Sequence, residues 1–278
     1  MFSGPKPVEE AYTGPEMGPT IRWGLTILLM LVCAATPAHA QSAAASDRET
    51  QSPAASGSPD FLFGQPRARL TLGGAWLAPR ARGDLFTFIS DQLTLDRTDF
   101  RAAAFTGSVG IAVTGRVEAT GDFEVSRHAI GSEYRRYVKA DRSSITQKTQ
   151  LNQGTVAFGA RYLPMGRGQS ISRFAFLPRR VAPFAGAGLS LVKYELLQSG
   201  EFVDFVDLSI FNHSFRSSGW SVGRYADAGA DVQIWRMFFL NGSVRYVWAN
   251  SDLSRDFVGF HGIDLSGFKS STGVTIVF

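Results

Sequence analysis

The chain closes with the segment Phe268–Phe278, which reads FKSSTGVTIVF. Val274, Ile276 and Phe278 fall on one parity, and the other parity is polar or small except for Val277. Alternation with period two is typical of a β-strand that has one apolar and one polar face. The sequence therefore predicts that the chain ends in a β-strand.

The same alternation recurs upstream and predicts eight strands in all. The remaining seven segments are Leu70–Trp76, Phe105–Val113, Val117–Val125, Val156–Tyr162, Val181–Glu195, Trp220–Ile234 and Phe238–Trp248. In Val181–Glu195 the residues are small enough that either parity could face outward, and Arg224 interrupts the apolar parity of its segment.

The connectors between these segments alternate in length. The short connectors are Thr114-Gly115 and the residues around Arg236. Leu163–Arg180 should also be short, because it lies on the same side of the sheet as these two, but it is long. Long connectors on one side and short ones on the other are typical of up-and-down barrels of outer membranes. The long connectors are Ala81–Arg101, Ile130–Gln150, Gln198–Ser218 and Asn250–Gly267.

Such strands can form either a soluble sandwich or a membrane barrel. In a sandwich the apolar faces pack together, whereas in a membrane barrel they meet lipid and the polar faces point inward. The apolar parity is rich in Ala and Gly, which fill a soluble core poorly, and aromatic residues gather near the strand ends. We therefore predict an all-β fold, an up-and-down antiparallel transmembrane β-barrel.

An apolar run, Trp23–Thr36, precedes this region. It is shorter than the ~20 residues that a membrane-spanning helix needs. Ala38 and Ala40 match the small-x-small pattern that a signal peptidase cleaves. We therefore expect residues 1–40 to be a cleaved export signal and the mature protein to begin at Gln41.

The remaining chain divides into a linker and a barrel domain. Residues 41–65 are rich in Ala, Ser, Pro and Gly without periodicity, which predicts a flexible linker. Residues 66–278 carry the alternating segments and form the predicted barrel domain. The acidic residues near the start leave Met1 and Met17 as alternative start sites.

The composition excludes several classes of protein. Hydrophobic residues make up 44% of the chain, too many for a disordered or collagen-like protein. A net charge of +4 is too small and too scattered to indicate nucleic-acid binding. One Cys excludes an intramolecular disulfide or a multi-thiolate metal site.

Three segments resemble the family of eight-stranded outer-membrane β-barrels that includes the transmembrane domain of OmpA, OmpW and the opacity proteins. They are Ala182–Leu189 (APFAGAGL), Phe239–Tyr246 (FLNGSVRY) and Gly273–Phe278 (GVTIVF). The resemblance covers about Arg67 to Phe278. It implies a Gram-negative-type outer membrane, with its lipid and lipopolysaccharide as surroundings. It also implies that the assembly machinery reads Val274, Ile276 and Phe278 as a C-terminal signal.

Charged residues on the inward parity are expected to share the lumen of the barrel. An eight-stranded barrel is just wide enough for its own side chains, and unpaired charges there are costly. The charges could form a salt-bridged network that holds the barrel rigid, or they could line a selective pathway. They are Arg69, Arg116, Glu118, Asp122, Glu124, Arg161, Asp227, Asp231, Arg245 and Lys269.

No catalytic, cofactor or metal site is expected. A lipid-modifying enzyme of this class would need a spaced His and Ser with a downstream Glu, whereas His213 and Ser214 are adjacent and no Glu follows Glu201. His128 and His261 have no neighbouring ligand set in the sequence that would hold a metal. A strand hidden in 84–95 would reopen the possibility of a ten-stranded protease.

The functional hypotheses therefore concern the loops and the lumen. The connector Gln198–Ser218 is rich in Phe, so it either extends its strands or forms a mouth for a hydrophobic ligand or an extracellular partner. We expect a structural or surface-interaction role. The alternative is a narrow channel or hydrophobic small-molecule pathway like that of OmpW.

Overall fold

The computed structural model describes residues 61–278 except residues 173 and 258, and leaves out the side chain of residue 255. The predicted export signal, with Ala38, Ala40 and Gln41, and residues 41–60 of the predicted linker lie outside the described residues.

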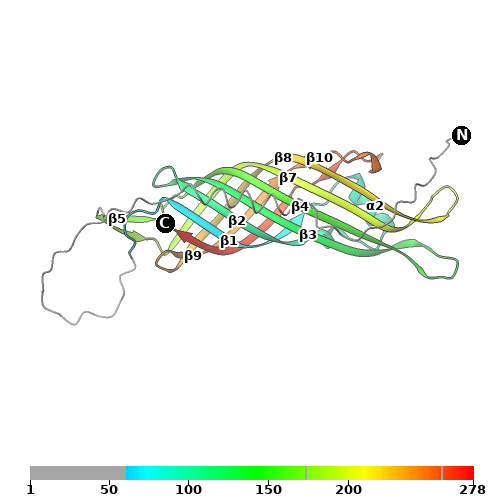
Figure 1. Cartoon of the computed structure of the whole chain (residues 1–278), viewed down its shortest axis with the longest axis horizontal. Helices are drawn as coiled ribbons and strands as arrows, with labels where there is room; N and C mark the ends of the chain where they lie inside the picture. The colour runs from blue at the N-terminus through cyan, green and yellow to red at the C-terminus, as the bar shows by residue number, and fades with distance from the viewer. Residues whose placement is uncertain (1–60, 173, 258) are drawn as a thin grey trace, which may run out of the picture. The chain divides into compact units, whose positions relative to one another are not determined.

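The described residues form a closed antiparallel barrel of eight strands (Figure 1). Neighbouring strands in the chain are neighbours in the sheet, and β1 pairs with β12 to close it, with Arg69 opposite Val277. This confirms the predicted up-and-down barrel. The barrel strands are β1 (Ala68–Pro79), β2 (Ala102–Ala112), β3 (Val117–Val138), β4 (Ser144–Tyr162), β7 (Val181–Val203), β8 (Ile210–Trp235), β9 (Phe238–Trp248) and β12 (Gly267–Val277).

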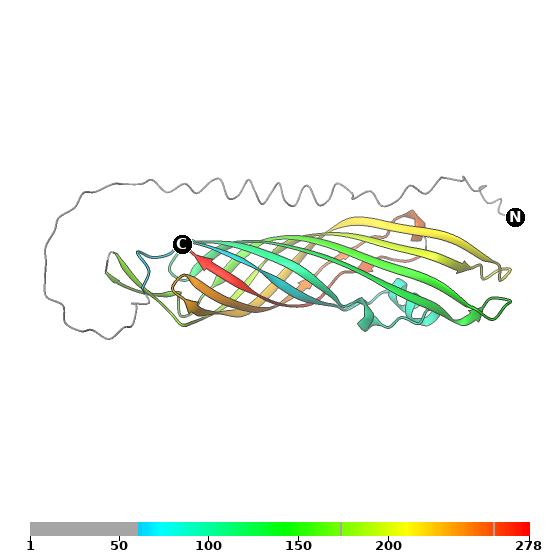
Figure 2. The same cartoon turned by 60° about the horizontal axis from the view of Figure 1, so that its bottom comes forward.

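The strands fall into a short class and a long class. β1, β2, β9 and β12 are short, about the length with which a tilted strand crosses a bilayer. β1 has 12 residues, and β2, β9 and β12 have 11 residues each. β3, β4, β7 and β8 have 22, 19, 23 and 26 residues and project beyond one end (Figure 2). We call this end the loop end, and the opposite end, which holds the C-terminus, the turn end.

The projecting strands correct two predicted connectors. Most of Ile130–Gln150 and of Gln198–Ser218 continues the strands, and only residues 139–143 and 204–209 connect them. The strand-extension alternative for the Phe-rich segment is therefore confirmed.

Both edges of the projecting sheet are covered by connectors. β3 has no β2 partner beyond Ser126, and the β1–β2 connector takes its place: the Thr94 N–H donates to the Glu133 carbonyl at 2.8 Å. On the β8 edge, the Ser254 hydroxyl donates to the Arg216 carbonyl at 2.8 Å. Covered edges do not offer a template for pairing with another chain.

At the turn end, the long connector Leu163–Arg180 contains a hairpin of β5 (Gly168–Ser172) and β6 (Ala175–Pro178). This hairpin explains why the connector is longer than a simple turn. The Leu62 N–H donates to the Phe176 carbonyl at 2.8 Å, so the end of the predicted linker pairs with the hairpin.

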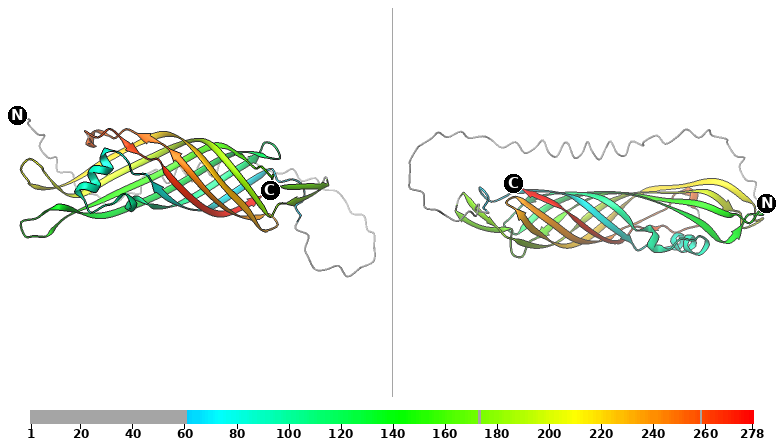
Figure 3. Two further views of the ribbon diagram at one scale, coloured as in Figure 1. Left: turned by 180° about the vertical axis from the view of Figure 1, so that it is seen from behind. Right: turned by 90° about the horizontal axis from the view of Figure 1, so that it is seen from below.

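Among the described residues, helical structure lies only in connectors. The β1–β2 connector forms α2 (Asp84–Gln92) and the 3₁₀ turn η1 (Arg97–Phe100), and the β9–β12 connector forms β10 (Asn250–Ser251), the 3₁₀ turn η2 (Arg255–Phe257) and β11 (Ile263–Asp264) (Figure 3). Residues 84–92 are thus helix and not a hidden strand. In the part of the chain that the structure describes, no helix is long and apolar enough to cross a membrane.

The outward faces of the strands carry an apolar band with a sharp upper limit. Three consecutive rows of paired outward residues cross β3, β4, β7 and β8. From the turn end toward the loop end, they change from apolar through mixed to polar. The rows are Phe123–Val156–Leu191–Val222, Val125–Gly154–Lys193–Trp220 and Arg127–Asn152–Glu195–Ser218.

Aromatic side chains border this band on both sides. On the loop side these are Trp76, Trp220, Trp248 and Phe268, and on the turn side Tyr162, Trp235 and Phe278, all exposed. Arg224, which breaks the apolar parity, lies beside Trp248, with its guanidinium carbon 5.6 Å from the ring centre. Two aromatic girdles around an apolar band are the arrangement of a membrane barrel.

Candidate functional site

The lumen near the turn end is filled by a first cluster of ion pairs. Glu118 accepts hydrogen bonds from Arg69 Nε at 3.0 Å and from Arg167 Nη2 at 2.9 Å. Arg167 Nη1 lies 3.5 Å from Asp231 Oδ2, and Asn241 donates its side-chain amide to Asp231 Oδ1 at 2.6 Å. Each charge is thus compensated where water is scarce, as buried charges require.

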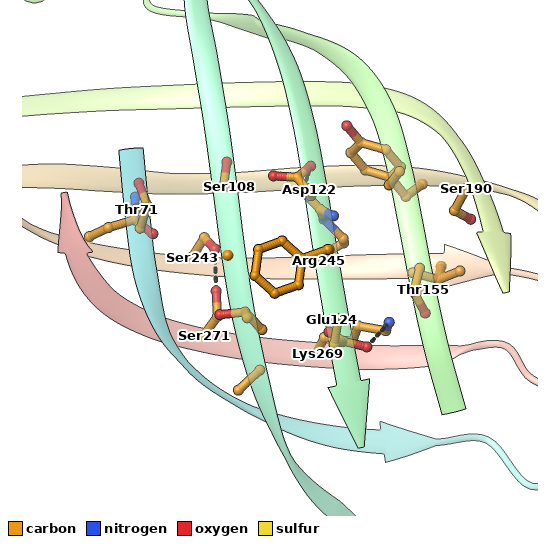
Figure 4. A pocket seen from close by; sticks show the side chains of 18 of the residues that line it. Thr71, Ser108, Asp122, Glu124, Thr155, Ser190, Ser243, Arg245, Lys269 and Ser271 are labelled. Atoms are coloured by element: carbon orange, nitrogen blue, oxygen red, sulfur yellow. Dashed lines mark hydrogen bonds and ion pairs between the residues drawn. The ribbon is translucent and has the colours of Figure 1, made fainter. Parts of the chain in front are cut away.

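A second cluster lies further along the lumen and centres on Arg245. Its Nη2 donates to Asp122 Oδ2 and to Asp227 Oδ2, each at 2.8 Å. Arg161 Nη2 reaches the same Asp227 oxygen at 3.4 Å. Nearer the loop end, Lys269 Nζ donates to Glu124 Oε1 at 2.5 Å (Figure 4).

Two glycines of the APFAGAGL segment make room for this cluster. A Cβ on Gly186 would lie 2.2 Å from Asp227 Oδ1, and a Cβ on Gly188 would lie 2.8 Å from the ring of Tyr225. The freed space allows the Arg245 guanidinium carbon to stack 4.0 Å from the centre of the Tyr225 ring. Such cation–π contacts add to the ion pairs that hold the guanidinium.

A cavity remains between these side chains, lined by residues of both clusters (Figure 4). Its volume is about 60 Å³, which is room for a few water molecules and not for an organic ligand. Hydroxyl groups such as those of Ser243 and Ser271, which hydrogen-bond each other at 2.7 Å, line it with the charges.

The structure places nine of the ten proposed lumen residues inside the barrel and leaves Arg116 outside. Arg116 is exposed in the β2–β3 turn, where the Thr114 hydroxyl accepts hydrogen bonds from the N–H groups of Arg116 and Val117 and closes the turn. Arg167, which was not among the predicted lumen residues, enters the lumen and pairs with Glu118 and Asp231. The unusual length of its connector was the only sign in the sequence that this segment returns to the lumen. The nine are Arg69, Glu118, Asp122, Glu124, Arg161, Asp227, Asp231, Arg245 and Lys269.

Above the ion pairs, an apolar plug closes the loop end. Leu85, Phe86 and Ile89 on the buried face of α2 pack with Phe100 of η1, and the Phe86 and Phe100 rings meet edge to face at 5.0 Å. Strand residues that face inward complete the plug, together with residues of the β9–β12 connector. They are Leu151, Val192, Tyr194, Leu196, Val247, Phe257, Ile263 and Leu265.

Sequence reasoning treats the β1–β2 connector as a loop and so misses the plug. A signal is present, because Leu85, Phe86, Ile89 and Leu93 recur at helical spacing. The helix itself is short, and a short helix is stabilised by the surface against which it packs, which the sequence does not reveal.

Replacing Ile89 by Asp should detach α2 without unfolding the barrel. A buried carboxylate has no partner among the apolar side chains of the plug, so the connector should open locally. Limited trypsin digestion should then cut at Arg82 and Arg97 many times faster. The matched control is Thr87→Asp on the exposed face of the same helix, and the folded band on an unheated gel should persist in both variants.

Aromatic rings from three connectors and from the end of β3 gather on the loop end. The Phe88 ring lies 6.3 Å from the Phe205 ring and 5.6 Å from the Phe260 ring, and the Tyr137 ring lies 5.9 Å from the Phe205 ring. We call these residues the loop-end aromatic cluster. Phe88 and Phe205 are exposed, so the cluster offers apolar surface to the outside.

The tip of the β3–β4 hairpin is closed by Asp141. Its Oδ1 accepts hydrogen bonds from the Ser143 hydroxyl at 2.7 Å and from the Ser143 N–H at 3.0 Å. These bonds hold the pKa of the Asp141 carboxyl below its ordinary value, because they stabilise the charged form.

The histidines singled out in the sequence have separate surroundings. The His213 ring lies between those of Phe211 and Phe215, 6.4 and 4.6 Å away. His128 Nε2 contacts the Asp99 carbonyl at 2.7 Å, and His261 Nδ1 lies 2.5 Å from Asp84 Oδ2. Within residues 61–278 as described, no three His, Cys, Asp or Glu residues are grouped as metal ligands.

The C-terminal residues proposed as an assembly signal lie on the outward face of β12. Val274 and Phe278 are exposed and Ile276 is half-buried. The Phe278 carbonyl accepts hydrogen bonds from the N–H groups of Arg67 and Ala68 at 2.9 and 2.8 Å. The last residue therefore takes part in closing the barrel.

Comparison with known proteins gives structural similarity only. No family model matches the sequence, and no curated protein matches it. The chain is similar to the outer membrane protein OprG from Pseudomonas aeruginosa, with a TM-score of 0.49 and 11% identity over 79% of this chain and 98% of that one.

Two further solved structures are similar. Neisserial surface protein A matches with a TM-score of 0.41 and 13% identity over 80% of this chain and 99% of that one. The N-terminal β-barrel domain of Pseudomonas aeruginosa OprF matches with a TM-score of 0.35 and 14% identity over 77% of this chain and 99% of that one.

Proposed function

We propose that this protein is a sealed outer-membrane barrel that acts through its surface at the loop end, in a structural or surface-interaction role. The apolar band, the two aromatic girdles and the membrane-matched length of the short strands support a membrane location. The barrel is closed, so it leaves no unpaired sheet edge in hydrocarbon, as a spanning sheet requires.

The observation that carries the proposal is the double closure of the interior. Five basic and five acidic side chains pair across the lumen, counted among the described residues, and the apolar plug lies between them and the loop end. An open pore needs a continuous wet path, which paired charges and a dry plug both oppose. This arrangement favours a role at the surface over transport.

The projecting sheet supports a surface role in a second way. β3, β4, β7 and β8 carry their connections well past the apolar band, and the loop-end aromatic cluster lies on this projection. Exposed aromatic side chains are frequent anchors in protein interfaces. We infer that an extracellular partner, or a hydrophobic ligand, binds there.

The barrel should show no steady conductance in a planar lipid bilayer. In concentrated KCl the unmodified protein should leave the current at the baseline of the protein-free bilayer, because ion pairs and plug both block the lumen. Folding of the inserted sample is checked by its unheated mobility on a denaturing gel. Stable, uniform current steps from the unmodified protein would contradict the sealed-barrel proposal.

A second candidate is a narrow pathway that opens when α2 moves. It is favoured by one observation, that a connector and not a barrel strand supplies much of the plug. The Ile89→Asp variant distinguishes the two candidates: current steps only in this variant would assign the plug as a gate.

We also propose that the protein is not an enzyme. His213 lies between two Phe rings, and no hydrogen bond or ion pair joins it to a carboxylate of the described residues.

A further inference from the structure

We propose that the turn end of the barrel binds anionic phospholipid headgroups through a ring of exposed arginines, which we call the arginine collar. This inference rests on the proposed membrane location. The collar consists of Arg67, Arg116, Arg179, Arg180 and Arg236, all of them exposed.

The collar residues are distributed over every connection at the turn end. Arg67 leads into β1, Arg116 lies between β2 and β3, Arg179 and Arg180 precede β7, and Arg236 lies between β8 and β9. Because β1 and β12 close the barrel, these positions encircle the whole end. A ring of this kind suits a ligand that surrounds the protein, as a lipid leaflet does, better than a partner that binds one face.

Acidic residues are absent from the connecting segments of the turn end. Residues 61–67, 113–116, 163–180 and 235–237 contain no Asp or Glu. Among the described residues, the side chains of Arg67, Arg116, Arg179 and Arg180 have no ion-pair partner. The carboxylates of Glu118 and Asp231 are already engaged by Arg69 and Arg167.

At the loop end, in contrast, carboxylates are present and several basic residues pair with them. Arg135 lies 3.5 Å from Asp96, Lys139 lies 2.6 Å from Glu201, and Arg216 pairs with Glu195. The loop-end connectors, residues 80–101, 139–143, 204–209 and 249–266, contain seven Arg or Lys and ten Asp or Glu, whereas the turn-end connectors are basic only. Its partner should be an anion at the level of that end.

Three of the four parts of the collar lie close in the chain to an exposed apolar side chain at the lower limit of the band. Val113 precedes Arg116, Val181 follows Arg180, and Trp235 precedes Arg236. Near the end of the hydrocarbon, an Arg can lay its methylene groups along apolar surface and place its guanidinium among headgroups. A phosphate diester beside glycerol is the anion found at this depth, and Arg matches phosphate geometry well.

The size of the effect follows from surface electrostatics. Each Arg near an anionic membrane surface contributes a preference of about fivefold. Lipids exchange around the ring and contact one or two arginines at a time. We therefore expect roughly a five- to tenfold preference for anionic over zwitterionic lipid, weakened by salt.

Quenching of Trp235 by brominated lipids tests the proposal, since this residue lies next to Arg236 in the collar. Trp23, Trp76, Trp220 and Trp248 are replaced by Phe, and the folded protein is reconstituted into phosphatidylcholine vesicles. We compare the fraction of brominated phosphatidylcholine and the fraction of brominated phosphatidylglycerol that quench Trp235 equally. The ratio of the first fraction to the second should be five to ten. It should fall below two in the fourfold variant, which combines Arg67→Gln, Arg116→Gln, Arg179→Gln and Arg180→Gln.

Two controls make the result specific. The matched variant Arg127→Gln, Arg136→Gln, Arg142→Gln at the loop end should keep the preference, and a protein that retains only Trp76, which is exposed on the loop side of the band, should show none. If the fourfold variant folds poorly, two other measurements replace it. The double variant Arg179→Gln, Arg180→Gln should lower the ratio, and added NaCl should lower the ratio of the starting protein.

Three results would overturn the collar: equal quenching by both lipids in the starting protein, an unchanged ratio in the fourfold variant, or the same preference at Trp76. Failure of the unmodified protein to enter vesicles in folded form would instead contradict the proposed membrane location. The two proposals therefore fail in different measurements.

Discussion

Replacing Arg245 by Leu should lower the free energy of unfolding of the barrel by about 3–5 kcal/mol, the cost of stranding a buried charge. One nitrogen of Arg245 contacts both Asp122 and Asp227 at 2.8 Å, and the Asp227 side chain is 1% exposed. Leu offers neither carboxylate a donor. The remaining contact of Asp227, with Arg161, is longer at 3.4 Å.

Reversible urea unfolding in lipid vesicles, followed by the unheated mobility of the folded form, measures this loss. Arg116→Leu is the matched control, because Arg116 is exposed in a turn. Replacement of such a surface residue should have almost no effect on the free energy of unfolding. Adding Asp122→Asn to Arg245→Leu should recover part of the stability. Equal midpoints for Arg245→Leu and Arg116→Leu would show that the lumen is wet and wide.

Deleting Phe278 should reduce assembly in cells several-fold, while it lowers the stability of the refolded barrel by about 2–4 kcal/mol, the value of its three backbone hydrogen bonds. The Phe278 carbonyl and N–H bond Arg67 and Ala68, and the exposed ring adds little internal packing. The larger effect in cells is expected if an assembly machine reads the terminal aromatic residue.

The measurement compares two yields of the same variant. Membrane fractions of cells that express the shortened chain are assayed for the folded form, and the purified chain is refolded into detergent. Phe278→Tyr serves as the control, because it keeps the aromatic ring and the backbone hydrogen bonds. Wild-type assembly of the shortened chain in cells would refute the assembly-signal hypothesis.

The barrel strands could be predicted from the sequence because successive side chains of each strand face two different surroundings, the lumen and the lipid. The lumen demands polar or charged side chains, such as Asp227 and Arg245, and the outside demands apolar ones, such as Val244 and Ala226. This contrast gives a signal of period two in the strands. It is weakest in Val181–Glu195, where small residues leave either parity free to face outward in the sequence, and where Gly186 and Gly188 face inward to make room for larger neighbours.

The signal fails where this contrast disappears. Beyond the apolar band, the outward residues of the long strands become polar, while inward residues such as Tyr194 and Leu196 are buried in the apolar plug. The parity reverses there, so the periodicity predicts loops where the strands continue. The sequence places Arg116 and not Arg167 in the lumen for a related reason. The turn and the returning connector are set by local hydrogen bonds and tertiary packing, which leave no periodic pattern.

The closure of β1 on β12 also determines how fast the molecule can form and how long it lasts. Arg69 pairs with Val277 across nearly the whole described chain, and the Lys269–Glu124 and Arg245–Asp122 ion pairs join residues 145 and 123 positions apart. Contacts between such distant residues form late, because the intervening chain must first be ordered. The last hairpin therefore completes the seam and the central ion pairs in one event. Once formed, they must break together, so the native barrel should decay with a half-life far longer than its equilibrium stability alone would suggest.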